Sequence, residues 1–385
     1  MQAFAALNNP AEVGLSVVKY AMDQIALVIP SELQRVRKLV LRYGWNTTSY
    51  QILNPGISHW FSAAGDAVLG YVEYHGVRIV AGAPICLQER LADVSAEFER
   101  DSAAASLSVC YFCAESRLEM IFRNSTSHSM ALLGAQPAWQ PQAWPHVFEH
   151  HASLKAQLNR ARNKDVTVRE WPAELASREP QLLSCLRDWL GTHRFPTLHF
   201  LVEPMTLERL YDRRIFVAER QNKIIGFVVA SPVPQRNGWL IEQIIRGRGA
   251  VNGTSELMID TAVNALAAGG SEFVTMGLSP LSRRAVVEWD SNPLWLRVLL
   301  DWARAHGRRF YNFDGLDAFK SKFHPQRWEP IFAIANQSHF SPVILYAVSA
   351  AFTQSSPIGA VARAILSAIR MEMGWLLGKS GRRTV

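Results

Sequence analysis

The hydrophobic and polar positions in the first half of the chain predict both strands and helices. Two β-rich runs flank His75-Gly76, a pair typical of a hairpin turn. Leu91, Val94 and Phe98 then recur at intervals of three and four, which predicts an amphipathic helix, and another β-rich run follows. The elements predicted here are strands at 67–74, 77–81 and 109–112 and helices at 90–105 and 117–124.

The second half repeats this order. Two β-rich runs flank the polar turn Gln221-Asn222-Lys223, and a third strand, a helix, a strand and a last helix follow. Strands interleaved with helices in both halves predict an α+β fold, and their order matches the fold of the Gcn5-related N-acetyltransferases, used twice in tandem. The predicted elements are strands at 215–219, 224–230, 239–246 and 273–277 and helices at 254–268 and 293–305.

Length and pattern together predict how the chain is divided. At 385 residues the chain is too long for one ordinary core and fits two domains of common size. The predicted parts are an N-terminal extension at 1–35, a first acyltransferase-like domain at 36–148, a basic linking helix at 149–182, a second acyltransferase-like domain with the catalytic site at 183–335, and an amphipathic helical tail at 336–385.

Composition fits a globular protein with a slightly basic surface. Hydrophobic residues make up 49% and charged residues 19% of the chain, which is enough apolar surface to bury a core. Lys and Arg number 40 against 33 Asp and Glu, a net charge of +7. This excess favours polyanionic partners such as nucleic acid or anionic lipid, and an ordinary solvated surface explains it about as well.

Two basic amphipathic segments are candidates for contact with polyanions. Residues 149–165 predict a helix rich in His, Lys and Arg that faces either solvent or phosphate. The tail after Ser356 has apolar residues at helical spacing, which predicts packing on the second domain. Its basic face and basic end also suit peripheral contact with an anionic membrane surface.

The sequence predicts neither an export signal nor a membrane-spanning helix. Lys19 and Asp23 interrupt the apolar residues before Pro30. The apolar run at 340–352 is shorter than the roughly 20 residues that a helix needs to cross a bilayer. We therefore expect a cytoplasmic protein that can also lie peripherally at the inner face of the cytoplasmic membrane.

The cysteines do not predict a metal site or an oxidising compartment. Cys110 and Cys113 form a CxxC pair, and no second pair completes a zinc site. The pair lies in a predicted strand, where residues three apart point to opposite faces and cannot chelate one ion. We therefore expect buried structural thiols and no bound metal.

The most specific motifs lie between residues 272 and 330. Gly277-Leu-Ser-Pro-Leu-Ser282 follows a predicted strand, and an aromatic-rich segment with two lysines two apart follows at 310–330. This arrangement resembles the phosphatidylglycerol lysyltransferase family, whose full-length members include the multiple peptide resistance factors. The matching positions are Gly277, Pro280, Leu281, Ser282, Gly315, Leu316, Lys320, Lys322, Phe323, Pro325, Trp328 and Pro330.

Weaker matches extend the resemblance to roughly residues 36–335. Glu242 and Arg246 are similar to the family's acidic-x-x-x-Arg strand. The spacing from Pro325 to Trp328 is one residue longer than is usual in the family, so we expect a different local path there. Further similar segments are Asn252-Gly253-Thr254, residues 43–50 and residues 82–85.

The resemblance implies a stand-alone aminoacyltransferase. Its expected reaction moves an amino acid from aminoacyl-tRNA onto the hydroxyl of phosphatidylglycerol or a related lipid. The aminoacyl ester is already activated, so the exchange of one ester for another needs no cofactor, and the enzyme has to hold two polyanions and stabilise an oxyanion. The implied partners are an aminoacyl-tRNA donor, an anionic phospholipid acceptor and a separate flippase; the oligomeric state stays open.

The resemblance also implies site residues. We expect Lys320 and Lys322 to face phosphate or the tetrahedral intermediate; residues two apart diverge on a helix, so both can serve one ligand only where the chain is extended. Asp314 and Glu242 are candidates for binding the substrate amine or for proton transfer, and Arg246 for binding lipid phosphate. The further substrate-binding candidates are Asn252, Gly277, Ser279, Ser282, His324, for which we favour a structural role over that of a base, and Trp328, which we favour as a packing anchor.

Three alternatives remain open at the level of sequence. The same chemistry can use a non-lipid acceptor, and the same fold can form a non-catalytic module that binds anionic lipid or RNA. Transfer from acetyl coenzyme A is disfavoured, because Arg246-Gly-Arg-Gly-Ala-Val251 places Val251 where the pyrophosphate loop of that class needs Gly or Ala.

Overall fold

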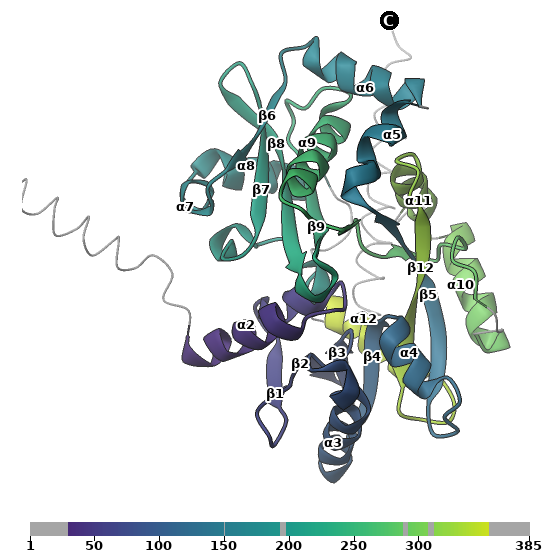
Figure 1. The fold of residues 1–385 in the computed structure, drawn as a ribbon. Helices are drawn as coiled ribbons and strands as arrows, with labels where there is room; N and C mark the ends of the chain where they lie inside the picture. The colour runs from purple at the N-terminus through teal and green to yellow at the C-terminus, as the bar shows by residue number, and fades with distance from the viewer. Residues whose placement is uncertain (1–29, 150, 193–197, 288–291, 307–311, 354–385) are drawn as a thin grey trace, which may run out of the picture.

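The strands form one continuous sheet through both halves of the protein (Figure 1). The computed structural model describes residues 30–149, 151–192, 198–287, 292–306 and 312–353. Its 12-stranded sheet has the order β1-β2-β3-β4-β12-β5-β10-β9-β8-β7-β6, and β11 pairs with β5. The strands are β1 (Ser58–Phe61), β2 (Val68–Tyr74), β3 (Val77–Ala81), β4 (Ser108–Ala114), β5 (Ser129–Trp139), β6 (Thr167–Trp171), β7 (Arg214–Arg220), β8 (Lys223–Val233), β9 (Gly238–Arg246), β10 (Phe273–Thr275), β11 (Ser279–Pro280) and β12 (Arg327–Ala335).

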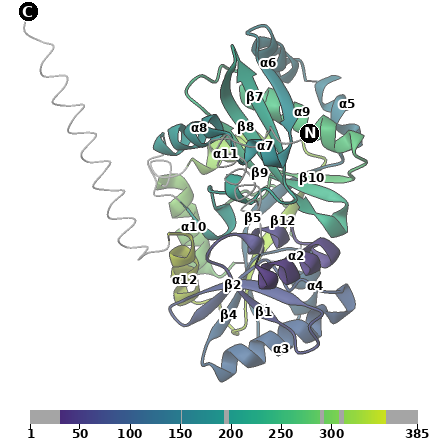
Figure 2. The same ribbon diagram turned by 90° about the vertical axis from the view of Figure 1, so that its left-hand side faces the viewer.

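Helices cover both faces of the sheet, as the two perpendicular views show (Figures 1 and 2). In the first half, α3 and α4 pack on one face, while α2, α12 and Leu296 of α10 pack on the other. In the second half, α5, α6, α9 and α11 cover one face, and α7 and α8 cover the other. The α-helices of the described residues are α2 (Ser31–Tyr43), α3 (Leu91–Ala104), α4 (Ser116–Phe122), α5 (Trp144–Glu149), α6 (Ala152–Arg162), α7 (Ala173–Ala176), α8 (Pro180–Gly191), α9 (Thr254–Ala268), α10 (Leu294–His306), α11 (Phe313–Ser321) and α12 (Pro342–Thr353).

Two tight hairpins explain why the antiparallel strands were predictable. At the β2–β3 turn, His75 and Gly76 both have positive φ, and Tyr74 pairs with Val77. At the β7–β8 turn, Gln221 and Asn222 both have positive φ. Two consecutive left-handed residues give a turn whose twist matches that of the strands, so each hairpin forms locally.

The halves exchange their last strands. In the first half β4 runs parallel to β3, and in the second half β10 runs parallel to β9. The antiparallel neighbour beyond β4 is β12, which comes from the end of the second half, and the neighbour beyond β10 is β5, which comes from the first half. β5 and β12 also pair with each other along their full lengths. Each half therefore completes its sheet with a strand from the other.

The structure corrects two local predictions. The strand expected at 273–277 ends at Thr275, and Pro280 pairs with Gly134 in a further short strand, β11. Cys110 and Cys113 were expected on opposite faces of their strand, yet both belong to one buried cluster with Phe112. Cys113 has a φ of +61° where the register with β12 shifts, so a β-bulge resets the alternation of side chains.

One predicted segment lies outside the described residues, and another has a different secondary structure from the one expected. The amphipathic tail after Ser356 lies outside the described residues. The segment 149–182, expected to form one basic linking helix, contains the helix α6 followed by the strand β6 and the helix α7. Within the described parts of the chain, no helix has the length and apolar character that crossing a bilayer requires.

Gly134 allows β11 to lie against β5 and provides a test of this packing. Its φ is +150°, and a Cβ atom there would collide with the carbonyl oxygen of Ser279 and lie 2.9 Å from the amide nitrogen of Leu281. We expect Gly134→Ala to lower the free energy of unfolding by about 2–4 kcal/mol, because overpacking and backbone strain add. The matched control is Gly76→Ala, where φ is +75° but no atom lies within 4 Å of the added Cβ. Its cost should be about 1 kcal/mol in urea unfolding; equal costs would contradict the close approach of β11.

Candidate functional site

The segment from Gly277 to Ser282 leaves the sheet through a sharply folded loop. Gly277 has a φ of +68°, and its amide donates to the hydroxyl oxygen of Thr275 at 3.0 Å. After the short pairing of β11 with β5, Leu281 also adopts a left-handed conformation, with φ +60°. Ser279 is buried, and its hydroxyl has no hydrogen-bond partner among the described residues. Neighbours on β5 and α11 therefore hold the predicted Gly-x-Ser-Pro-Leu-Ser motif in a strained shape.

Lys320 of α11 forms hydrogen bonds to the backbone of this loop. Its Nζ donates to the carbonyl oxygens of Gly277 at 2.9 Å and of Leu278 at 2.8 Å. Burial lowers the pKa of Lys320 to about 7, with Asp317 acting in the opposite direction. An amine with this pKa gains or loses its proton near neutral pH. Its two hydrogen bonds fix the backbone of the loop.

A cavity of about 310 Å³ opens beside the loop, between β5 and α10. Its walls combine leucine side chains with the guanidinium groups of three arginines. Ser282, Asn292 and Asp301 add polar groups to the lining. The apolar and cationic residues lining it are Leu132, Leu133, Leu281, Leu300, Arg283, Arg297 and Arg304. Such a lining suits a ligand with an anionic group and an apolar part.

Arg304 connects the cavity to α11. Its Nε donates to the carboxylate of Asp314 at 3.0 Å, and its Nη1 donates to the carbonyl oxygen of Leu281 at 3.2 Å. Both members of the Arg304–Asp314 pair are about one-third exposed. Of the predicted residues, Ser282 lines the cavity, and Asp314 is linked to it through Arg304. Lys320 contacts the loop that carries Ser282 at the carbonyl oxygens of Gly277 and Leu278.

A second group of predicted residues gathers at the other end of α11. Lys322 forms an ion pair with Glu256 in the first turn of α9, and its ammonium lies 4.2 Å from the centre of the Phe319 ring. His324 stacks on His151, just before α6, with ring centroids 3.2 Å apart. Burial and His151 both lower the pKa of His324. Lys320 and Lys322 therefore point to different neighbours, because α11 continues helically through Ser321.

The first turn of α9 is covered by α6. Gly253 has a φ of +93°, and a Cβ atom there would collide with the carbonyl oxygen of Gln157 and lie 3.3 Å from the Cβ of Ala161. Arg162 also pairs with the buried Asp260 of α9 at 3.2 Å. The pyrophosphate of coenzyme A would need the amides of this helix start to be accessible, so the packing of α6 disfavours that donor.

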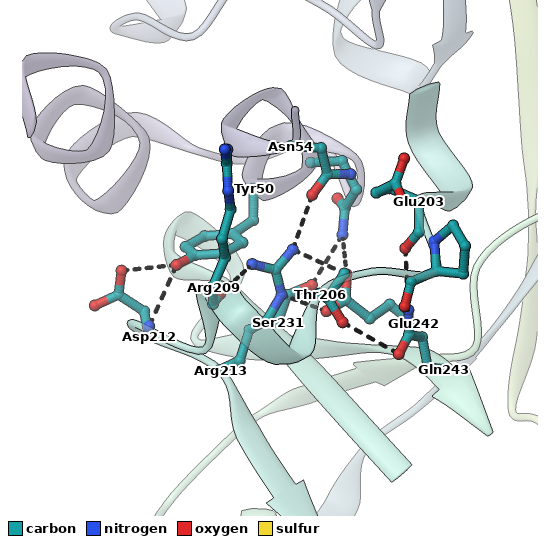
Figure 3. Close-up of polar contacts among 12 residues, drawn as sticks. Tyr50, Asn54, Glu203, Thr206, Arg209, Asp212, Arg213, Ser231, Glu242 and Gln243 are labelled. Atoms are coloured by element: carbon teal, nitrogen blue, oxygen red, sulfur yellow. Dashed lines mark hydrogen bonds and ion pairs between the residues drawn. The ribbon is translucent and has the colours of Figure 1, made fainter. Parts of the chain in front are cut away.

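Glu242 lies in a buried polar joint between the halves (Figure 3). Arg213, itself fully buried, donates to its carboxylate from Nε at 2.5 Å, and Gln51 donates to it at 2.9 Å. Arg213 also donates to Asn54 at 3.0 Å. Glu242 is the extra residue of a β-bulge, because Ala230 pairs with Ile241 and Val229 with Gln243. The carboxylate thus already has a charged partner.

The remaining predicted residues lie apart from these groups. Arg246 is exposed at the end of β9 and donates to the carbonyl oxygen of Ala250 at 3.3 Å. Asn252 is exposed before α9. Trp328, at the start of β12, is half-buried, and the guanidinium carbon of Arg284 lies 5.2 Å from the centre of its ring. The structure does not bring these three side chains to the cavity.

Sequence reasoning found Leu281 and Ser282 but missed the other residues that line the cavity. Residues 293–305 were predicted only to form a helix rich in Trp and Leu, although Arg297 and Arg304 lie two helical turns apart in it. The strand β5, which supplies Leu132, Leu133 and Gly134, was not predicted at all. The spacing of Arg297 and Arg304 was the sequence feature that could have indicated the cavity. Arg213 belongs to no motif, so no such feature indicated its role in the buried joint.

Comparisons with known proteins agree with this architecture. Residues 37–335 match the family described as phosphatidylglycerol lysyltransferase, C-terminal. The C-terminal domain of a putative lysylphosphatidylglycerol synthetase from Agrobacterium fabrum is similar in structure, with a TM-score of 0.71 and 19% identity over 83% of this chain and 96% of that chain. The L-PGS of Bacillus licheniformis has a TM-score of 0.67 and 17% identity over 87% of this chain and 96% of that chain. These likenesses confirm the α+β, tandem acyltransferase-like fold.

An uncharacterised protein of Corynebacterium glutamicum is 22% identical over 328 residues, which is 80% of this chain. The chain spans about 40% of the length of that relative.

The buried amine of Lys320 predicts a pH-dependent stability. Its pKa of about 7 lies below the value of about 10.4 for lysine in an unfolded chain. Between these values the unfolded chain binds a proton that the folded protein does not, so the group destabilises the fold as the pH falls toward 7. From pH 7 to 8.5 we expect the wild type to gain stability relative to Lys320→Met, by up to about 1.4 kcal/mol per pH unit. Urea unfolding at several pH values measures this; a stability difference independent of pH would contradict it.

The Arg213–Glu242 pair predicts a large and coupled loss of stability. We expect Glu242→Ala to lower the free energy of unfolding by about 3–5 kcal/mol, because it leaves a buried guanidinium without its counter-ion. Arg213→Met combined with Glu242→Leu should lose less than the two single changes together. The control is Arg169→Ala, which breaks an exposed pair with Glu219 and should cost less than about 1 kcal/mol. Near-wild-type stability of Glu242→Ala would show that the pair is not required by the fold.

Proposed function

Because the chain belongs to the phosphatidylglycerol lysyltransferase C-terminal family, we propose that it transfers an aminoacyl group from aminoacyl-tRNA to a hydroxyl of phosphatidylglycerol or a related anionic lipid. The lipid hydroxyl oxygen attacks the carbonyl carbon of the aminoacyl ester. The bond to the ribose oxygen of tRNA then breaks, and that oxygen takes up the proton lost by the lipid hydroxyl. One ester replaces another, so no cofactor is consumed.

The observation that carries this proposal is the cavity between β5 and α10. Its leucines suit the glycerol and acyl-chain carbons of a lipid, while Arg297 and Arg304 suit its phosphate. The Arg304–Asp314 pair is partly exposed, so a phosphate can compete with the carboxylate for the guanidinium at small cost. Asp314, the carboxylate beside Arg304, is the candidate for binding the amine of the aminoacyl group.

Lys320 acts in this proposal as a positioning residue. Its ammonium or amine contacts the backbone of Gly277 and Leu278, so it sets the shape of the loop that carries Ser282. Ser282 lines the cavity and can donate a hydrogen bond to the oxyanion formed at the ester carbonyl. This assignment replaces the direct contact with phosphate expected for Lys320 from the resemblance.

The donor tRNA has a candidate surface on α6. Leu154, Leu158 and Ala161 face the core, whereas Lys155, Arg160 and Lys164 at its end are exposed. A helix with one buried face and one basic face presents its charge to solvent, as a phosphate backbone requires. The acceptor lipid and the donor tRNA would then use different parts of the molecule.

The test is a transfer assay with purified protein, vesicles containing phosphatidylglycerol and radiolabelled aminoacyl-tRNAs, followed by thin-layer separation of the lipids. We expect a tRNA-dependent labelled lipid. Arg304→Gln should reduce kcat/KM for the lipid about 10- to 100-fold, because a charge-assisted hydrogen bond contributes about 1.5–3 kcal/mol. Arg304→Lys keeps the charge, so its kcat/KM should fall less than that of Arg304→Gln but stay below that of the wild type.

Arg169→Gln is the matched control, since Arg169 is an exposed arginine on β6 with one carboxylate partner. Its kcat/KM should equal that of the wild type. Label recovered only in a water-soluble product would instead indicate a non-lipid acceptor. Absence of product with every donor would favour a module that binds polyanions without catalysis.

A further inference from the structure

Helix α10 exposes an unusual number of large apolar side chains. Leu294 is 68% exposed, Val298 is 62% exposed and Trp302 is 60% exposed, and these residues are one helical turn apart. Trp295 and Leu299 beside them are also exposed. Single exposed apolar residues are normal on a protein surface, whereas a contiguous stripe along one helix marks an interaction site. We call these five residues the α10 stripe.

The stripe adds to the apolar side that already packs in the core. Leu296 is 2% exposed and belongs to the core cluster of the first half, and Leu300 packs against the same cluster. At 3.6 residues per turn, the stripe covers about 140° of the helix circumference, on the side of Leu296 away from the cavity. The helix therefore has more apolar surface than packing within the protein requires.

The polar side of the same helix forms the wall of the arginine-lined cavity. Arg297, Asp301 and Arg304 lie on this side. The stripe and the cavity thus share one helix, and both views show α10 at the periphery of the molecule (Figures 1 and 2). A bilayer that covers the stripe would therefore lie within one helix diameter, roughly 10–12 Å, of the cavity.

The charges around α10 favour an anionic surface. Among the described residues of this region, the arginines at 283, 284, 297 and 304 outnumber the aspartates at 301, 314 and 317. The excess is small, so burial of apolar surface should dominate and electrostatic attraction should add to it. An apolar stripe flanked by arginines is complementary to the boundary between acyl chains and anionic headgroups.

We propose that α10 is an interfacial helix, which inserts its exposed apolar stripe into the surface of an anionic bilayer and so presents the cavity to lipid headgroups. This inference rests on the proposed function in one respect, since it supplies the route by which the lipid acceptor reaches the cavity. The bilayer contact itself is a binding property and can be measured without any transfer reaction.

The first experiment is co-sedimentation of the full chain with vesicles of phosphatidylcholine containing about one-third phosphatidylglycerol. We expect the wild type to bind, and Leu294→Gln combined with Val298→Gln to bind at least about tenfold more weakly, because two inserted side chains are lost. Gln nearly matches Leu in helix propensity, and both side chains are exposed, so α10 should be retained. Val298→Gln alone, with a smaller expected loss, serves if the double variant does not fold.

The matched control replaces two other apolar residues that are also more than half exposed, Met120 on α4 and Leu175 on α7, by Gln. This control should bind vesicles like the wild type. Raising the salt concentration should weaken binding of every protein but leave the ratio between wild type and α10 variant unchanged, because salt screens charges and not apolar insertion. Equal binding of the α10 variant and the wild type, or no binding of the wild type, would overturn the proposal.

A change in oligomeric state would also overturn it. If the wild type forms dimers that the α10 variant cannot form, while both bind vesicles equally, the stripe is covered by a second copy. Analytical ultracentrifugation without lipid measures this. We expect the same mass for both proteins.

A transfer assay on a monomeric short-chain phosphatidylglycerol separates this inference from the proposed function. The α10 variant should match the wild type on this soluble acceptor and lose about tenfold or more on vesicles. If neither protein transfers label to either acceptor, the proposed function fails, and the sedimentation result still decides whether α10 binds the bilayer.

Discussion

The insertion of β12 between β4 and β5 is the constraint on which the rest of the structure depends. It closes the sheet of the first half with a strand from the end of the second, while β5 closes the second half in return. Without this exchange, buried strands would end in unpaired edges. Arg236 secures the insertion, because it donates to Glu329 on β12 and to Glu115 after β4. Burial acts to raise the pKa of Glu329, but the hydrogen bonds and charge of Arg236, together with hydrogen bonds from Arg327 and Gln136, lower it to about 2. Burial raises the pKa of Glu115 to about 7 despite the same cation.

The candidate site follows from this exchange. Helix α11 leads into β12, so the position of β12 in the sheet determines where Lys320 reaches the carbonyl oxygens of Gly277 and Leu278. β5 holds the same loop from the other side through β11. The cavity lies where these elements meet α10. Neither half contains all of these parts, and the lining comes from two distant segments, residues 132–134 and 281–304.

Local elements were predictable from the sequence because their causes are local. The hairpins at His75-Gly76 and Gln221-Asn222 follow from residues that accept positive φ, and α9 follows from helical spacing between Thr254 and Ala268. The strand exchange was not predictable, since register between distant strands depends on packing that no single segment encodes. The motif around Lys320 was found through a family resemblance, but its partners were not, because a lysine facing two backbone carbonyls leaves no trace in side-chain pattern. Whether the named residues act in catalysis stays a prediction.

Burial decides which charged residues can meet a ligand. Arg213 and Glu242 lie almost wholly out of solvent and satisfy each other, so displacing either partner would strand a charge in a medium of low polarity. Arg304 and Asp314 are about one-third exposed, and an ion pair at such a position stabilises the protein little. A phosphate can therefore take the place of Asp314 beside Arg304 without loss of the fold. The chain thus contains charges of two kinds: those near the joint are buried and hold the halves together, and the pair beside the cavity is partly exposed, as the proposed binding of an anionic lipid requires.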